Sequence, residues 1–266
     1  MSRSKVKNLL LLKQIHSAIA QIKKGKMDKA LETLDKAEDS ARKAEATDTL
    51  YYILFMRGGI FFTESKYDEA LETYKKALDA GSELLKADPE NINYQHYMGT
   101  TLSTTGNLLK KKSENPQAAE YYSRAREIYV NLLAQDPENV AFRASAGENL
   151  NNYAALLTDM GSFEEACEVL RQAIELYEKL LEENPYNPGY QAELSVALSL
   201  LGNCLIQQDP EKCDTAKQSL EKALSMQENL LTQQPENENI KGAIVFTRER
   251  LEKLEALVKP EKLEKL

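Results

Sequence analysis

The chain has 266 residues, of which 42% are hydrophobic and 29% are charged, and its formal net charge is −8. This composition excludes a disordered chain, and no apolar run approaches the roughly 20 residues of a membrane span. Residues 1–26 hold seven Lys or Arg and no acid, which leaves a charge of −15 on the remainder. Such an acidic surface argues against nucleic-acid binding, because phosphate contacts need basic side chains.

The first predicted element is an amphipathic helix that ends near Ile22. Its apolar run, residues 9–12, is too short for the core of a secretory signal. A second apolar stripe begins at Ala30, so residues 7–46 are predicted to form a short, divergent hairpin. Binding of the lysine-rich face to a membrane surface is the alternative. We favour a terminal cap, because the first unit of a repeat array is usually atypical.

The next predicted helix, Leu50 to Phe62, is apolar almost all round. Such a helix is either buried on every side or exposes an adhesive patch. Coverage by the preceding hairpin is favoured over a ligand groove. Both interpretations can be partly correct, since one face of this helix should point to the inner side of the array while the preceding hairpin covers another.

From residue 48 onward the sequence repeats. Four prolines close the copies at spacings of 48, 48 and 50 residues: Pro89, Pro137, Pro185 and Pro235. Each copy has an Ala nineteen residues before its proline, another Ala twelve residues before it, and a Leu-Leu pair just ahead. Small residues let two helices approach closely, while the leucines fill the wider end. The copies are 48–89, 91–137, 139–185 and 187–235.

The third copy shows most clearly that each copy is a helical hairpin. Apolar residues at steps of three and four form one stripe over residues 150–157 and another over residues 163–180. Gly161 and Ser162 separate the two helices, and Ser162 with Glu165 is predicted to form a capping box. One hairpin cannot bury both of its faces, so neighbouring hairpins must stack on it.

Three further positions recur in register. Small residues in the first helices are predicted at helix crossings: Gly58, Gly106, Ala154 and Gly202. An Asn two residues after each closing proline is predicted as an N-cap, with Pro188 at a first helical position: Asn91, Asn139, Asn187 and Asn237. Large apolar residues that follow indicate packing between repeats: Tyr94, Phe142, Tyr190 and Ile240.

The last predicted helix covers residues 237–258. Its apolar stripe lies among charged residues, as is typical of a capping element: Ile240, Ile244, Leu251 and Leu254. We expect the tail from Pro260 to fray.

These residues resemble tetratricopeptide repeats, whose signature runs W-x2-L-G-x2-Y, A-x3-F and P. The fourth copy reads Leu198-x2-Leu201-Gly202-x2-Leu205, Ala216-x3-Leu220 and Pro235. Here Leu replaces the Trp, and the period is 48 instead of 34. The difference between these two periods is about four helical turns. Two turns added to each helix of the hairpin would therefore keep its apolar face in the same orientation. The third copy is also similar to the repeats of kinesin light chains.

The resemblance implies an all-α fold: a right-handed α-solenoid of stacked antiparallel helical hairpins, a tetratricopeptide-like superhelix over residues 1–266. It also implies a protein-protein interaction scaffold that holds a protein or peptide partner in its concave groove. The alternative is a structural subunit that self-assembles through its N-terminal apolar region or its last helix. A monomer or weak homodimer, with no nucleic acid and no membrane span, is expected.

In tetratricopeptide repeats the first helix of each hairpin lines the groove. Carrying this over predicts ten groove residues: Tyr52, Phe55, Phe62, Asn107, Lys110, Lys111, Glu148, Asn151, Asn152 and Asn203. A row of Asn amides could pair with the backbone of an extended peptide, although solvent exposure is the simpler explanation of a mid-helix Asn. The family's clamp for a terminal carboxylate is not supported, because Ser103 and Val196 stand where its lysines are expected.

No phosphate loop, His-bearing metal spacing or nucleophile motif is present, so we expect no enzyme, no catalytic residue, no metal and no cofactor. A solenoid groove could still bring two distant acids together, as in a glycosidase. The odd number of cysteines indicates a reducing, cytoplasmic location. Cys167 is expected to be buried, and burial is favoured over metal binding for Cys204 and Cys213, which flank a predicted turn at Asp209–Pro210.

Overall fold

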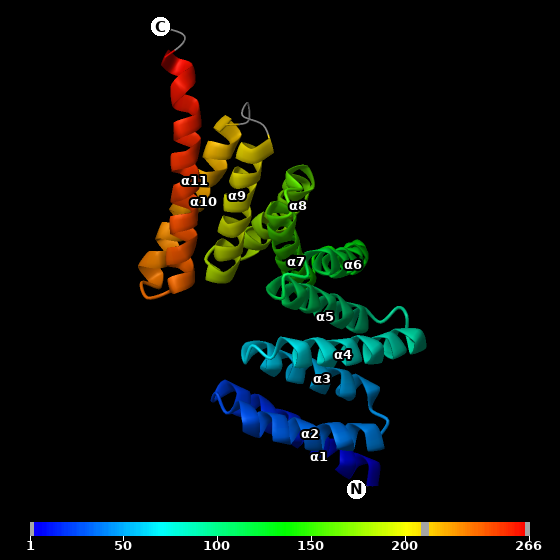
Figure 1. Ribbon diagram of the computed structural model, residues 1–266. Helices are drawn as coiled ribbons and strands as arrows, with labels where there is room; N and C mark the ends of the chain where they lie inside the picture. The colour runs from blue at the N-terminus through cyan, green and yellow to red at the C-terminus, as the bar shows by residue number, and fades with distance from the viewer. Residues whose placement is uncertain (1–2, 209–212, 264–266) are drawn as a thin grey trace. The chain divides into compact units, whose positions relative to one another are not determined.

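The computed structural model describes residues 3–208 and 213–263, and every regular element in these ranges is an α-helix (Figure 1). The helices are α1 (Arg3–Lys23), α2 (Met27–Lys43), α3 (Thr47–Thr63), α4 (Tyr67–Ala87), α5 (Ile92–Lys111), α6 (Asn115–Gln135), α7 (Val140–Asp159), α8 (Phe163–Glu183), α9 (Pro188–Gln208), α10 (Cys213–Gln233) and α11 (Glu238–Leu263). The predicted all-α class is confirmed. The predicted turn at Asp209–Pro210 lies outside the described residues.

Consecutive helices pack against one another as hairpins. Such pairs include α1 with α2, α3 with α4, α7 with α8 and α9 with α10. Neighbouring hairpins stack on one another: α2 packs on α3, α4 on α5, α8 on α9 and α10 on α11. In addition, α9 contacts both α7 and α11, so these three first helices form one layer. The fold is an α-solenoid of stacked hairpins, as predicted.

The chain divides into two compact units, residues 1–128 and 129–266, with the border inside α6. Each unit has hydrophobic clusters of its own, such as the one around Leu34 in the first and the one around Tyr177 in the second. A single array over residues 1–266 and the predicted repeat bounds stay predictions.

The turn inside a hairpin is set by one residue with a left-handed backbone. Ser65, Ser113 and Gly161 lie 48 residues apart and have φ angles of 59°, 61° and 79°. At the end of α7, the N–H groups of Gly161 and Ser162 donate to the carbonyls of Thr158 and Leu157. This pattern is a Schellman motif, which reverses the chain through the backbone alone.

The predicted capping box at the start of α8 is wrong. Ser162 is the N-cap residue but makes no side-chain hydrogen bond to the helix. The Schellman motif already fixes its backbone, and Glu165 instead accepts a hydrogen bond from the Tyr153 hydroxyl at 3.0 Å. The acid three residues after Ser162 therefore ties the two helices of the hairpin together.

The loops between hairpins follow the prediction. Each predicted Asn accepts hydrogen bonds from the N–H groups two and three residues later: Asn91, Asn139, Asn187 and Asn237. Pro188 is the first residue of α9. Its missing N–H is one that a first-turn residue does not need.

In the first unit, the predicted coverage of Leu50–Phe62 is confirmed. Ile53 and Ile60 of α3 are buried in a cluster with Leu11 and Leu34 of the first hairpin. The opposite side of α3 packs on α4, where Leu54 contributes to a second cluster. This double coverage explains an apolar helix without an exposed patch.

Small residues in the first helices lie at helix crossings, as predicted. A Cβ atom added to Gly106 would lie 2.8 Å from the Tyr122 ring, and one added to Gly202 would lie 2.9 Å from a methyl group of Leu220. Tyr122 is fully buried. The large side chain of the second helix therefore occupies the space that the missing side chain leaves.

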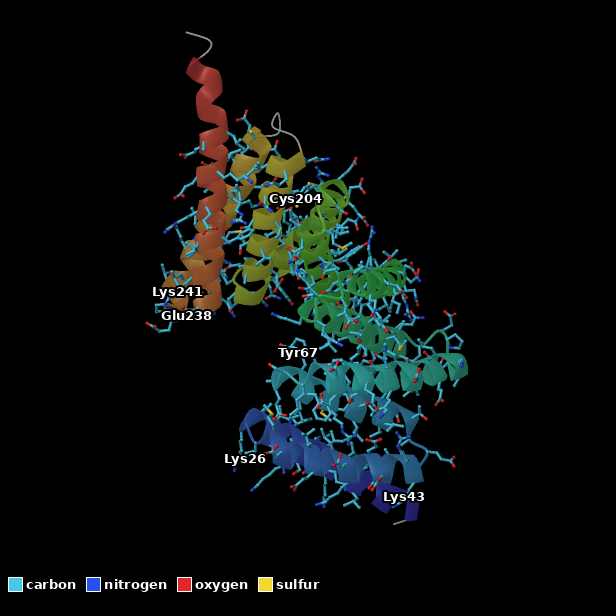
Figure 2. All side chains as sticks on the ribbon, in the orientation of Figure 1. Lys26, Lys43, Tyr67, Cys204, Glu238 and Lys241 are labelled. Carbon is cyan, nitrogen blue, oxygen red and sulfur yellow. The ribbon has the colours of Figure 1, made fainter. Side chains whose placement is uncertain are left out.

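The last helix packs with the predicted stripe, since Ile240, Ile244 and Leu254 are buried. It continues to Leu263, beyond the predicted end at residue 258. Fraying of the tail from Pro260 stays a prediction. An ion pair between Lys241 and Glu238 lies in its first turn, at 2.9 Å (Figure 2). A carboxylate at this end is favoured by the helix dipole.

Candidate functional site

The predicted groove residues of α3 differ in exposure. Tyr52 is 41% exposed. Phe55 and Phe62 are half-buried and pack against α4, with ring centroids 5.9 Å from Tyr74 and 6.0 Å from Tyr67. Tyr52 is thus the member of this aromatic group with the largest free surface.

The predicted groove residues of α5 are also unequal. The side-chain oxygen of Asn107 accepts a hydrogen bond of 2.6 Å from the Tyr122 hydroxyl. Lys110 is half-buried, whereas Lys111 is exposed. Asn107 therefore has its amide N–H groups, rather than its oxygen, left for a peptide.

In the second unit, α7 and α9 present a continuous solvent-facing strip. On α7, Glu148 is exposed and Asn152 is half-buried, one turn further along the same side. On α9, Val196 is exposed, while Glu193 and Asn203 are half-buried. We call these five residues the α7–α9 face. The second helices α8 and α10 pack on other sides of α7 and α9, and α11 also contacts α9.

Asn151 links the two helices beneath this face. Only 4% of its surface is exposed, and its amide nitrogen donates to Glu193 twice, to the carbonyl at 3.1 Å and to the carboxylate at 3.0 Å. Its buried side-chain oxygen has no hydrogen-bond partner. A predicted peptide contact is thus a structural residue that positions the Glu193 carboxylate.

Two carboxylates lie on this face, Glu148 on α7 and Glu193 on α9. Partial burial, followed by the charge of Glu193, raises the pKa of Glu148. Burial, followed by the charges of Glu193 and Glu148, raises the pKa of the Tyr177 hydroxyl. Tyr177 reaches this region because Gly147 has no side chain, and an added Cβ atom would lie 2.7 Å from its ring. The arrangement concentrates negative charge over a phenol.

Glu193 was not among the predicted groove residues. A signal exists in the sequence, because the matching positions of the other copies are uncharged: Tyr97, Ser145 and Ala243. Glu148 likewise stands where other copies have Thr100, Val196 and Phe246. Both carboxylates depart from the repeat pattern, and packing between repeats does not require them.

A cavity of about 360 Å³ adjoins the face where α9, α10 and α11 meet. Glu193 and Val196 lie on its edge, and Leu230 and Ile240 are among its apolar walls. Asn203 lies further along α9, where its oxygen accepts a hydrogen bond of 3.4 Å from Arg250. That arginine also stacks over the Phe246 ring at 3.9 Å.

Other chemistry is sparse in the part of the chain that the structure describes. No three His, Cys, Asp or Glu residues there are grouped so as to hold a metal ion. Cys167 and Cys204 are buried, as expected, and Cys213 is half-buried. None of the helices searched has the length and apolarity that crossing a membrane requires.

The fold and the α7–α9 face define the class of the protein: a helical repeat solenoid with an open layer of first helices. Residues 150–186 and residues 51–80 each match a family model described as Tetratricopeptide repeat. The third and the first predicted copies thus each match the tetratricopeptide repeat. No curated protein shows significant sequence similarity to it.

Solved structures of repeat proteins are similar to this chain. A variant of the nearly identical TPR-like repeats of a kinesin light chain from Podosopora anserina has a TM-score of 0.59 at 17% identity, over 88% of this chain and 99% of that one. The unsubstituted protein has a TM-score of 0.57 at 17% identity, over 82% and 94%. BtubC (BKLC) from P. vanneervenii has a TM-score of 0.51 at 17% identity, over 92% and 93%. These similarities show the fold, and they agree with the predicted likeness to kinesin light chain repeats.

Proposed function

We propose that this protein is a non-enzymatic, cytoplasmic scaffold that binds an extended segment of a partner protein along its first helices. The tetratricopeptide repeats support a scaffold for protein-protein interaction in general. The open layer of first helices supports the more specific role, because second helices cover the other sides of α7 and α9.

The observation that carries this proposal is the composition of the α7–α9 face. A solvated helix surface needs no particular arrangement of groups, but this face combines the exposed Val196 with the amide of Asn152 and two carboxylates. Amides pair with peptide backbone, and apolar side chains give contact area. A peptide in extended form fits such a mixed surface.

The test is affinity capture from a native lysate with paired variants. Asn152→Arg combined with Val196→Arg places two bulky cations on the face. Glu182→Arg combined with Glu164→Arg places two arginines on exposed positions of α8. We expect partners bound by the wild type and by the α8 variant to be lost from the face variant. Equal capture by all three proteins would contradict binding at this face.

Self-assembly is the second candidate, and the exposed apolar residues of α11 favour it. Val245 is 56% exposed and Leu257 is 47% exposed, and each gives another copy an apolar side chain to contact. Light scattering over a range of concentrations separates the two functions. A strict monomer would exclude self-assembly, whereas a dimer that Val245→Lys dissociates would favour it.

A further inference from the structure

The two carboxylates of the α7–α9 face have no basic partner in the described structure. Elsewhere in the second unit, exposed acids commonly pair with a Lys or Arg, as Glu178 does with Lys222 at 2.8 Å. No such pair involves Glu148 or Glu193 within residues 129–208 and 213–257. Two neighbouring carboxylates repel each other, so the free protein gains nothing from their proximity.

Asn151 supplies an independent sign of a missing group. Its amide lies against the Glu193 carboxylate, and its oxygen is buried without a donor. A buried acceptor without a partner costs free energy. A cation that bears several N–H groups could satisfy this oxygen and both carboxylates after a small shift of side chains.

Aromatic rings complete the surroundings. Tyr177 of α8 and Tyr190 of α9 belong to one packed cluster, and Tyr190 is half-buried. Aromatic faces attract ammonium and guanidinium groups. Tyr177 is buried, so Tyr190 is the ring of this cluster that a bound cation can contact.

The charge of the whole unit agrees with this chemistry. Residues 129–266 contain 24 Asp and Glu against 13 Lys and Arg, a formal charge of −11. Residues 1–128 contain 18 against 21, a formal charge of +3. The negative field of the second unit attracts cationic segments and repels acidic ones.

We infer that Glu148 and Glu193 together bind a Lys or Arg side chain of the partner peptide, with a neighbouring apolar side chain of that peptide in the cavity between α9, α10 and α11. This rests on the proposed function, since it specifies which peptide the α7–α9 face selects. Glu193 joins the two subsites, because it is both a carboxylate of the cation site and a residue on the edge of the cavity.

The test uses three fluorescein-labelled nonapeptides of Gly and Ser that differ in a central pair: Arg-Leu, Gln-Leu or Glu-Leu. Fluorescence anisotropy with the full chain should show the Arg-Leu peptide binding about tenfold more tightly than the Gln-Leu peptide, and the Glu-Leu peptide most weakly. Added salt should reduce this preference, because the site is open to solvent.

The variant pair is Glu148→Gln with Glu193→Gln against Glu164→Gln with Glu182→Gln, which removes the same charge from α8. Glutamine at position 193 keeps an oxygen that can accept from Asn151, so the fold should be kept, as far-UV circular dichroism can verify. We expect the first variant to lose the preference for Arg-Leu and the second to keep it. An unchanged preference in the first variant, or equal loss in both, would overturn the inference.

The two proposals fail in different ways. Suppose that captured partners depend on Asn152 and Val196, yet wild-type protein binds the Arg-Leu and Gln-Leu peptides equally. The scaffold function would then stand and the cation site would fall. If neither partners nor peptides respond to any substitution on the α7–α9 face, both proposals are wrong.

Discussion

A single polar residue in the first turn of three first helices holds the loop that precedes it. Four residues after the capping Asn, Gln95 donates to the carbonyl of Pro89 and Gln191 to that of Pro185, both at 2.8 Å. At the same position Arg143 donates to the carbonyl of Glu138 at 2.6 Å. Arg143 is 3% exposed and also pairs with Glu183 of α8 at 2.7 Å. Long polar side chains recur here because the loop carbonyl needs a donor.

At the same scale, Glu148 should destabilise the free protein near neutral pH. Its folded pKa lies above its unfolded pKa, so folding favours the neutral carboxyl, and this contribution is lost as the pH rises through the folded pKa. Glu148→Gln should therefore raise the melting temperature at pH 7 and change little below about pH 4. The gain should stay under about 1 kcal/mol, because the residue is exposed.

Thermal melts of the wild type and Glu148→Gln from pH 3 to pH 8 provide the measurement. Glu182→Gln, an exposed carboxylate on α8, is the matched control and should show no gain at pH 7. A gain that is largest at acidic pH would mean that folding lowers the pKa of Glu148 instead of raising it.

The left-handed serines give a second residue-scale prediction. Ser113 has a φ of 61°, where a side chain costs roughly 1–2 kcal/mol and glycine costs almost nothing. Glycine also gives the unfolded chain more entropy, which offsets part of this gain. Ser113→Gly should therefore raise the free energy of unfolding by about 0.5–1 kcal/mol, as urea unfolding can measure. Ser123→Gly, within α6, should destabilise by a similar amount. Destabilisation by both would refute the role of the turn.

At the scale of helices, complementary sizes fix how the two members of a hairpin cross. Gly58 faces Tyr74 and Gly106 faces Tyr122. In the register of the repeat, Ala154 stands where the glycines stand and Leu170 where the tyrosines stand. In the third copy a larger residue on the first helix thus accompanies a smaller one on the second. The fourth copy instead pairs Gly202 with Leu220.

Gly106→Leu tests this crossing. The new side chain would collide with the buried Tyr122 ring, so we expect a loss of about 1–3 kcal/mol of unfolding free energy by overpacking. Gly242→Leu on α11 is the control, because nothing lies within 4 Å of an added Cβ atom there. It should be neutral or stabilising, since leucine is the better helix former. Equal effects would mean that the crossing at Gly106 tolerates a side chain.

At the scale of the whole molecule, the thiols report whether the second unit stays folded. A hydrogen bond with Cys167, followed by burial, raises the pKa of the Cys204 thiol. Cys213 is half-buried at the start of α10. A thiol-specific colorimetric reagent should therefore label Cys213 fast in the native protein and the other two only as the unit unfolds.

Labelling time courses followed by intact mass spectrometry check this. The count should stop at one modified thiol without denaturant and rise to three with urea. Cys213→Ser should remove the fast phase alone. Fast labelling of all three thiols in native buffer would contradict the burial of Cys167 and Cys204.

The sequence by itself determined the helical repeat. A period of 48 residues, small residues at crossings and Asn-capped loops are local or periodic features, and each follows from the chemistry of one helix or one turn. These features predicted the hairpins, the buried Leu50–Phe62 helix and the final helix. The predicted capping box failed because two backbone hydrogen bonds had already fixed the turn around Gly161.

Only the tertiary structure decided which polar residues are free. Asn151 and Asn152 are neighbours in sequence and looked equivalent, but α9 packs against one side of α7, so Asn151 is buried on Glu193 while Asn152 is half-buried at the surface. Glu148 and Glu193 are 45 residues apart and become a pair only when two hairpins stack. A repeat pattern predicts the positions that all copies share. Charges present in one copy act through neighbours that packing alone brings together.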